Sequence, residues 1–220
     1  MLFRRALKVS VGLALALAAI TLQAAKEFVP PRPQNANTYA SKDAHPNDKV
    51  TAAIELYNSP PKNEIFVTPY SEYQLVPVFL IISNDGDQPI TLNNMRVELV
   101  TTRRAKLESL TTDDIFRRVS RVGASSTSPG RVGPLPMPGK NKNKKAQQEY
   151  AEINNASFAA QAIEPHTTKS GFLFFDVAGV APPIVEGAHI YLTGIRDANG
   201  NELLYFDIPV ISQNAANPGQ

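Results

Sequence analysis

Short segments in which apolar and polar residues alternate recur along this chain from position 50 to position 211, and they constrain its fold more than any other feature. In the last segment, every second residue from Leu204 to Val210 is apolar. A two-residue period is typical of a strand with one buried face. Turn residues separate the segments, and Asn199-Gly200 is a strong hairpin signal. About seven strands at hairpin spacing predict an all-β fold, an immunoglobulin-like antiparallel β-sandwich.

The segment from Tyr73 to Ser83 departs from this alternation, because successive residues from Leu75 to Ile82 are apolar. A short run that is apolar on both sides favours a central strand covered on both faces. Pro77 lies inside the run and has no N–H, so we expect its hydrogen-bond ladder to be interrupted on one side.

Two helical segments are expected after Arg103, where the strand pattern changes. Thr112 can cap a helix whose first turn holds Asp113 and Asp114, a charge order that complements the helix dipole. The second helix is expected over 144–154. Each has one apolar side, made of Ile115, Phe116, Val119 and Val122 in the first and of Ala146, Tyr150 and Ile153 in the second.

The remaining segments divide the chain into domain, insertion and tails. Residues 123–143 are rich in Gly, Ser, Pro, Asn and Lys, which predicts a mobile loop. We therefore expect a sandwich over 48–212 with a helix-and-loop insertion at about 103–156. Four prolines in 26–47 predict an extended tether without a core of its own. Residues 213–220 are expected to form a disordered tail.

Residues 1–25 have the layout of a secretory signal peptide: three basic residues, an apolar run over 9–22, and then Ala24 and Ala25. The run is shorter than the roughly 20 residues that cross a bilayer. An uncleaved N-terminal anchor is the alternative, and Arg4-Arg5 also allows a twin-arginine signal. We expect export through a cleaved signal peptide, a periplasmic or extracellular product, and no membrane span after cleavage.

The chain has no cysteine, which excludes disulfides, thiol catalysis and zinc-thiolate sites. Core packing alone must therefore hold an exported product together. Its charge is unevenly distributed: residues 103–145 hold 11 basic and 3 acidic side chains, a net charge of +8. The rest of the chain after the signal peptide carries −9. Such polarity indicates an acidic partner or an acidic surface elsewhere on the molecule.

Three stretches together resemble the exported bacterial immunoglobulin-like domains of the DUF4352 or MPT63 kind. They are Val76 to Ile90 with its Asn84-Asp85-Gly86-Asp87 turn, Ile163-Glu164-Pro165 followed by the aromatic strand from Gly171 to Val177, and the final hairpin. The resemblance covers about 48–211 without the insertion. It concerns β-sandwich packing and implies no catalytic residue.

The sequence contains no recognisable motif for catalysis, metal binding or phosphate binding. The three histidines, His45, His166 and His189, lack paired spacing, so a metal site would need residues from distant segments. The turn from Asp197 to Glu202 has oxygen ligands but not the order of a calcium loop, and is read as a hairpin turn. We expect no enzyme activity and no cofactor, with a metal-dependent hydrolase using His166, His189 and Asp176 as a less favoured alternative.

The basic insertion is the candidate binding site. Its residues are Arg117, Arg118, Arg121, Lys140, Lys142, Lys144 and Lys145. We expect a non-catalytic binding or assembly module that contacts an anionic envelope polymer or an unidentified protein through these side chains. No aromatic residue lies between Phe116 and Tyr150, so specific nucleic-acid recognition is not expected. Two alternatives stay open: a lysine-rich loop that is only solvated, and a structural envelope protein that pairs with a partner through an exposed strand edge.

Overall fold

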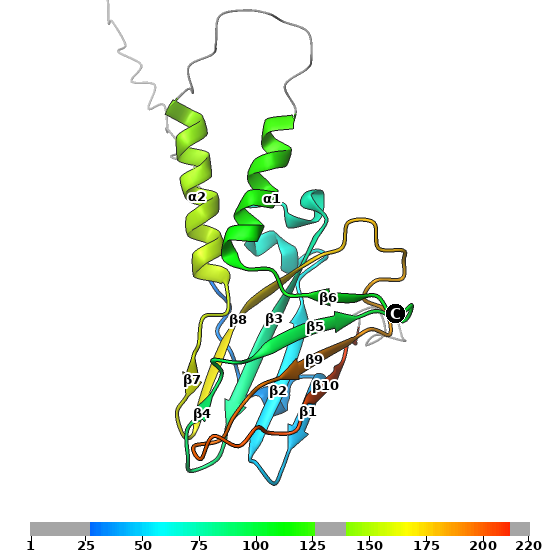
Figure 1. Ribbon diagram of the computed structural model, residues 1–220. Coiled ribbons are helices and arrows are strands. Elements are labelled where there is room, and N and C mark those ends of the chain that lie inside the picture. The colour runs from blue at the N-terminus through cyan, green and yellow to red at the C-terminus, as the bar shows by residue number, and fades with distance from the viewer. Residues whose placement is uncertain (1–26, 126–139, 212–220) are drawn as a thin grey trace, which may run out of the picture.

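The computed structural model describes residues 27–125 and 140–211. Within these ranges, ten strands form two four-stranded antiparallel sheets and a short two-stranded ribbon (Figure 1). We call the first sheet the covered sheet; its strands, in spatial order, are β1 (Ser41–His45), β2 (Val50–Leu56), β3 (Leu75–Asn84) and β8 (Thr167–Asp176).

The second sheet, the open sheet, packs against one face of the covered sheet. Its strands, in spatial order, are β10 (Phe206–Pro209), β9 (His189–Thr193), β5 (Arg96–Val100) and β6 (Lys106–Glu108). The ribbon joins β4 (Ile90–Thr91) to β7 (Ala162–Ile163). The helices are α1 (Thr112–Ser125) and α2 (Lys140–Ala156), with short 3-10 turns η1 (Ala36–Thr38), η2 (Lys62–Ile65) and η3 (Tyr70–Tyr73).

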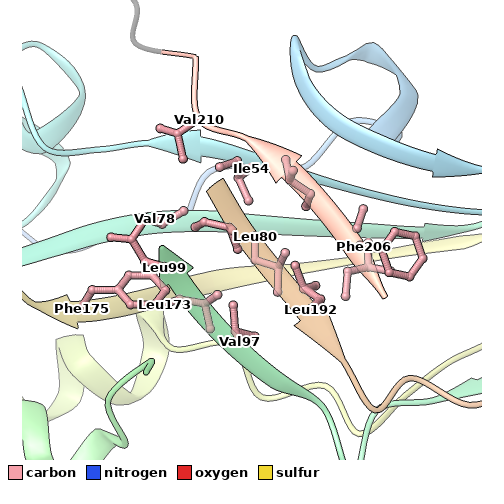
Figure 2. Close-up of a cluster of buried hydrophobic side chains, with 14 of the residues drawn as sticks. Ile54, Val78, Leu80, Val97, Leu99, Leu173, Phe175, Leu192, Phe206 and Val210 are labelled. Carbon is pink, nitrogen blue, oxygen red and sulfur yellow. The ribbon is translucent and has the colours of Figure 1, made fainter. Parts of the chain in front are cut away.

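The main core lies between the two sheets, as Figure 2 shows. Ile54 and Leu80 from the covered sheet meet Leu99, Leu192 and Phe206 from the open sheet, and all five are buried. These residues are the ones on each strand that face the other sheet. Burying such a side chain contributes about 1.5–3 kcal/mol each, so this layer supplies the cohesion that disulfides cannot.

A second core covers the other face of the covered sheet. Phe79, Phe172 and Phe174 point to this side and pack under η2, η3, the two helices and the N-terminal segment. All ten residues of β3 are buried as a result. The structure thus confirms an all-β sandwich with a helical insertion and a central strand covered on both faces.

One glycine is required on the opposite face of β8, where Phe158 packs against the main core. The chain returning from α2 crosses β8, and Phe158 donates its N–H to the Phe172 carbonyl at 2.9 Å. A Cβ added at Gly171 would lie 2.5 Å from the Phe158 Cα. Only glycine permits so close an approach of two backbones.

The expected tether over 26–47 is wrong for the residues that the structure describes. Phe28 and Ala36 are buried in the second core, and Ser41–His45 forms the edge strand β1, paired with β2 over five residues. The prolines remove N–H donors, but they do not prevent an extended segment from docking on an apolar face. The prediction from composition alone was therefore wrong for this segment.

The insertion is also narrower than 103–156. Lys106–Glu108 pairs with β5 as the strand β6, so the helical part begins after the sheet, at Thr112. Pro77 is accommodated because the pairing of β3 with β2 ends at Val78 and Leu56. The expected signal peptide, most of the expected mobile loop and the tail over 213–220 lie outside the described residues. No helix in the described part of the chain has the length and apolar character to cross a bilayer.

Candidate functional site

The helices α1 and α2 lie side by side and project from one end of the sandwich (Figure 1). We call this pair the helical hairpin. Its two members meet through Phe116 and Tyr150, whose rings are 5.2 Å apart in an edge-to-face arrangement. Ile115, Val119 and Ile153 are buried in the second core. The end nearest the sandwich is therefore fixed, and the opposite end, where α1 stops and α2 starts, is the distal end.

Thr111 and not Thr112 caps α1. The Thr111 hydroxyl accepts the Asp114 N–H at 3.3 Å and donates to the Asp114 carboxylate at 2.6 Å. This reciprocal pair satisfies a free backbone donor at the start of the helix. The Thr111 hydrogen bond, with Arg117 nearby, lowers the pKa of Asp114 below its ordinary value.

Arg118 fastens α1 to the sandwich. Its guanidinium donates to the Tyr73 carbonyl at 3.2 Å, to the Gln74 side chain at 3.4 Å, and to the Asp176 carboxylate at 3.3 Å. All three acceptors belong to the sandwich side of the same chain, so this side chain anchors the helix. The structure thus separates Arg118 from the other candidate residues.

Glu152 fastens α2 to the loop between η2 and η3. Its carboxylate, buried with 4% of the residue exposed, accepts the backbone N–H groups of Val67 at 2.5 Å and Thr68 at 3.1 Å. Burial raises the pKa of the Tyr70 hydroxyl, and the neighbouring Glu152 carboxylate raises it further. Charge-assisted bonds to two successive amides are strong, so this residue fixes the base of the hairpin.

Glu152 was missed at the sequence level because the apolar side of α2 was assigned differently. Ala146, Tyr150 and Ile153 were expected to face inward, yet Tyr150 is 44% exposed, while Ile153 is buried together with Glu149 and Glu152. The only local signal was that positions 149, 152, 153 and 156 share one helical face. Nothing near Glu152 in the sequence indicated that distant amides would bind it.

The sequence that spans the helical hairpin carries mainly positive charge. Between Asp114 and Glu149 the chain has eight basic residues and no acidic residue. Four of them, Lys140, Lys142, Lys144 and Lys145, occupy the first six positions of α2. A helix N-terminus carries partial positive charge and favours acidic side chains, so these lysines stand where helix stability disfavours them. The helix dipole and the four lysines both contribute positive charge at the distal end.

The seven predicted site residues are only partly brought together. Lys144 and Lys145 are exposed, and Lys145 lies 3.7 Å from the mostly buried Glu149 carboxylate. Arg117 is exposed but paired with Asp114 at 2.8 Å. Arg121, Lys140 and Lys142 have backbones in the helices near the distal end, and their side chains lie outside the described part.

His166, His189 and Asp176, the residues of the alternative metal-dependent hydrolase, each contact a different side chain. His189 is 2.6 Å from Asp207, and His166 is 3.2 Å from Asp87. Asp176 binds Arg118 and ends β8, whereas His166 precedes the start of this strand. The ten residues of β8 span about 30 Å at the usual rise of a strand. Across 27–125 and 140–211, no group of three His, Asp or Glu side chains could hold a metal ion.

The Asp197 turn uses its oxygens internally. One oxygen of the Asp197 carboxylate accepts the N–H groups of Asn199 and Asn201 at 2.9 and 2.8 Å, and the other accepts the Asn201 side chain at 3.0 Å. The Asn201 side chain is the main cause of the lowered pKa of Asp197. The arrangement is that of a turn stabilised by its own side chain.

The seam between the two sheets is closed at β10. Asp207 turns its N–H away from β9 and donates it to the Asp43 carboxylate of β1 at 2.8 Å. Pro209, two residues later on the same side, has no N–H. His45 also closes the seam, because its ring stacks on Phe206 at 3.9 Å. This edge offers few donors to another strand.

No protein-family model matches the chain, and no curated protein matches it.

Proposed function

We propose that this protein is an exported, non-catalytic binding module that contacts an anionic polymer of the cell envelope through the distal end of its helical hairpin. The observation that carries the proposal is the set of four lysines in the first six residues of α2. Their position opposes the helix dipole, so helix stability does not account for them. Export rests on the pattern of residues 1–25.

The geometry favours contact by the hairpin over pairing through a strand edge. The β10 edge is closed by Asp43 and Pro209. On the opposite side of the open sheet, β6 has three residues and carries Lys106 and Glu108, and short charged edges resist pairing. The hairpin, by contrast, holds its charge away from the body of the sandwich.

The test uses a variant in which Lys140, Lys142, Lys144 and Lys145 are all changed to Gln. Binding to immobilised dextran sulfate is measured, with uncharged dextran as the blank. We expect the wild-type protein to bind and to lose more than about tenfold in affinity between about 50 and 200 mM salt, because counterions screen exposed charges. The variant should bind no better than to the blank.

The control variant changes four exposed lysines of the sandwich, Lys42, Lys49, Lys106 and Lys169, to Gln. It has the same net charge as the hairpin variant, so it separates a local site from overall charge. Retention by the control and loss by the hairpin variant support the proposal. Equal loss by both variants, or binding that is independent of salt, contradicts it.

A further inference from the structure

A groove of about 390 Å³ lies between the two helices of the helical hairpin. Phe116 of α1 lines one side, and Ala146, Gln147 and Tyr150 of α2 line the other. Three of these four side chains are apolar or aromatic, and Tyr150 is 44% exposed, so an apolar surface faces the solvent. The volume lies within the range of small-molecule sites.

The packing of α2 on the sandwich does not account for Tyr150. The buried side of this helix is that of Glu149, Glu152 and Ile153. The Tyr150 ring instead packs edge to face on Phe116 at 5.2 Å and leaves much of its surface in water. A large aromatic ring gains free energy when it is removed from water, so its exposure beside a groove indicates a surface that a ligand covers.

Exposed lysines adjoin the groove on its distal side. Lys144 and Lys145 directly precede Ala146, and both are exposed. Lys145 lies 3.7 Å from the Glu149 carboxylate, whereas Lys144 has no ion-pair partner in the described part of the chain. Lys140 and Lys142 lie one to two turns closer to the start of α2. The apolar groove therefore leads into the basic distal end.

This combination is complementary to a molecule with anionic groups beside an apolar chain. A purely polar anion would contact the lysines and leave the groove in water, and an uncharged hydrocarbon would leave the lysines unused. Basic side chains next to aromatic ones bind anionic amphiphiles because apolar burial and charge attraction add. A second copy of this chain fits less well, because it would bring the same positive charge to the distal end.

We propose that the groove binds an acyl chain of the anionic envelope polymer. The chain lies against Phe116, Ala146 and Tyr150, and the anionic groups of the polymer face the lysines at the distal end. This inference rests on the proposed function and deepens it, because it restricts the polymer to one that is acylated.

The experiment compares dextran sulfate and uncharged dextran, each with and without a few octanoyl chains per molecule, by isothermal titration of the protein. We expect octanoyl dextran sulfate to bind at least about tenfold more tightly than dextran sulfate, because the groove removes the acyl chain from water. Octanoyl dextran, which has no anionic group, should bind about tenfold more weakly than octanoyl dextran sulfate.

Two variants test the groove itself. Tyr150→Ala removes one of its walls, and Ala146→Gln places a longer polar side chain in it while keeping the ring contact of Tyr150 with Phe116. Both variants should bind octanoyl dextran sulfate no more tightly than dextran sulfate. Tyr205→Ala is the matched control, because Tyr205 is a 51% exposed tyrosine next to β10, and it should bind like the wild type.

The outcomes separate this inference from the proposed function. If the wild type binds dextran sulfate equally well with and without octanoyl chains, the inference is overturned and the proposed function stands. If no sulfated polymer binds, both are contradicted. The inference is also overturned if octanoyl dextran binds as tightly as its sulfated form, or if Tyr150→Ala and Ala146→Gln bind like Tyr205→Ala. A wild-type dimer that Tyr150→Ala converts to a monomer would assign the groove to a second copy and overturn it as well.

Discussion

The two sheets of this sandwich differ in how many of their faces are buried. The covered sheet has the main core on one side and the second core on the other, so every residue of β3 is buried. The open sheet alternates: in β5, Val97 and Leu99 are buried while Arg96 is exposed. The difference teaches that the insertion is part of the folded core, because its helices cover a face that would otherwise expose aromatic rings to water.

The same difference explains where binding chemistry can reside. On the outer face of the open sheet, polar groups pair with one another, as Asp207 does with His189 at 2.6 Å. On the covered side, the loop between η2 and η3 is held by Glu152 and Arg118. The helical hairpin then extends beyond this layer with its basic distal end and the groove between its helices.

The largest predicted effect compares a buried aromatic residue of the covered sheet with an exposed one that precedes β10 of the open sheet. Phe172 is buried among Tyr57, Phe66 and Phe79, with ring centroids 4.9–5.0 Å away. Phe172→Ala should lower the free energy of unfolding by about 3–5 kcal/mol, measured by urea denaturation. Tyr205→Ala on the open side, where Tyr205 is 51% exposed, should cost less than about 1 kcal/mol. Equal losses would show that the second core is not a true core.

The next effect concerns the attachment of the hairpin. Glu152→Ala leaves the Val67 and Thr68 amides without their acceptor, and should lower stability by about 1–3 kcal/mol. Gln148→Ala, on the exposed side of the same helix, is the matched control and should change stability by less than about 0.5 kcal/mol. Chemical denaturation of both variants makes the comparison; a neutral Glu152→Ala would mean that the loop does not depend on α2.

A smaller effect should follow from removing the cap of α1. Thr111→Ala should lower the free energy of unfolding by about 1 kcal/mol, because the Asp114 N–H loses its acceptor. Thr112→Ala tests the alternative cap at the next position and should have less effect. Thermal denaturation of the two variants distinguishes them, and the reverse order would restore Thr112 as the cap.

The smallest effect is electrostatic and lies on the surface. Lys49 is the main cause of a pKa of Asp87 below its ordinary value of 3.8. A lowered pKa means that the ion pair stabilises the fold above pH 3.8, and that this contribution is lost as the pH falls through the lower folded-state value. Asp87→Asn should therefore be slightly less stable than the wild type at neutral pH and equal to it in strong acid. Added salt should shrink the neutral-pH difference, because the pair is exposed.

Much of the fold was predictable, because an element with one buried side has apolar residues at regular intervals in its sequence. The apolar run over β3 predicted a strand covered on both faces, and the Asn199-Gly200 turn predicted the final hairpin of β9 and β10. The start of α1 was predicted to within one residue of its cap. In each case neighbouring residues carry the information, since a two-residue or 3.6-residue period reports which side of an element is buried.

The sequence by itself determined most of the strands other than β1 and β6, the two helices and the concentration of positive charge in the insertion. Only the tertiary structure decided that Phe28 and β1 belong to the domain, that Arg118 faces the sandwich, and that Glu152 binds amides 84 and 85 positions earlier in the chain. The reason is physical: apolar periodicity is a local property, whereas the partner of a polar group is set by whichever distant segment the fold brings beside it.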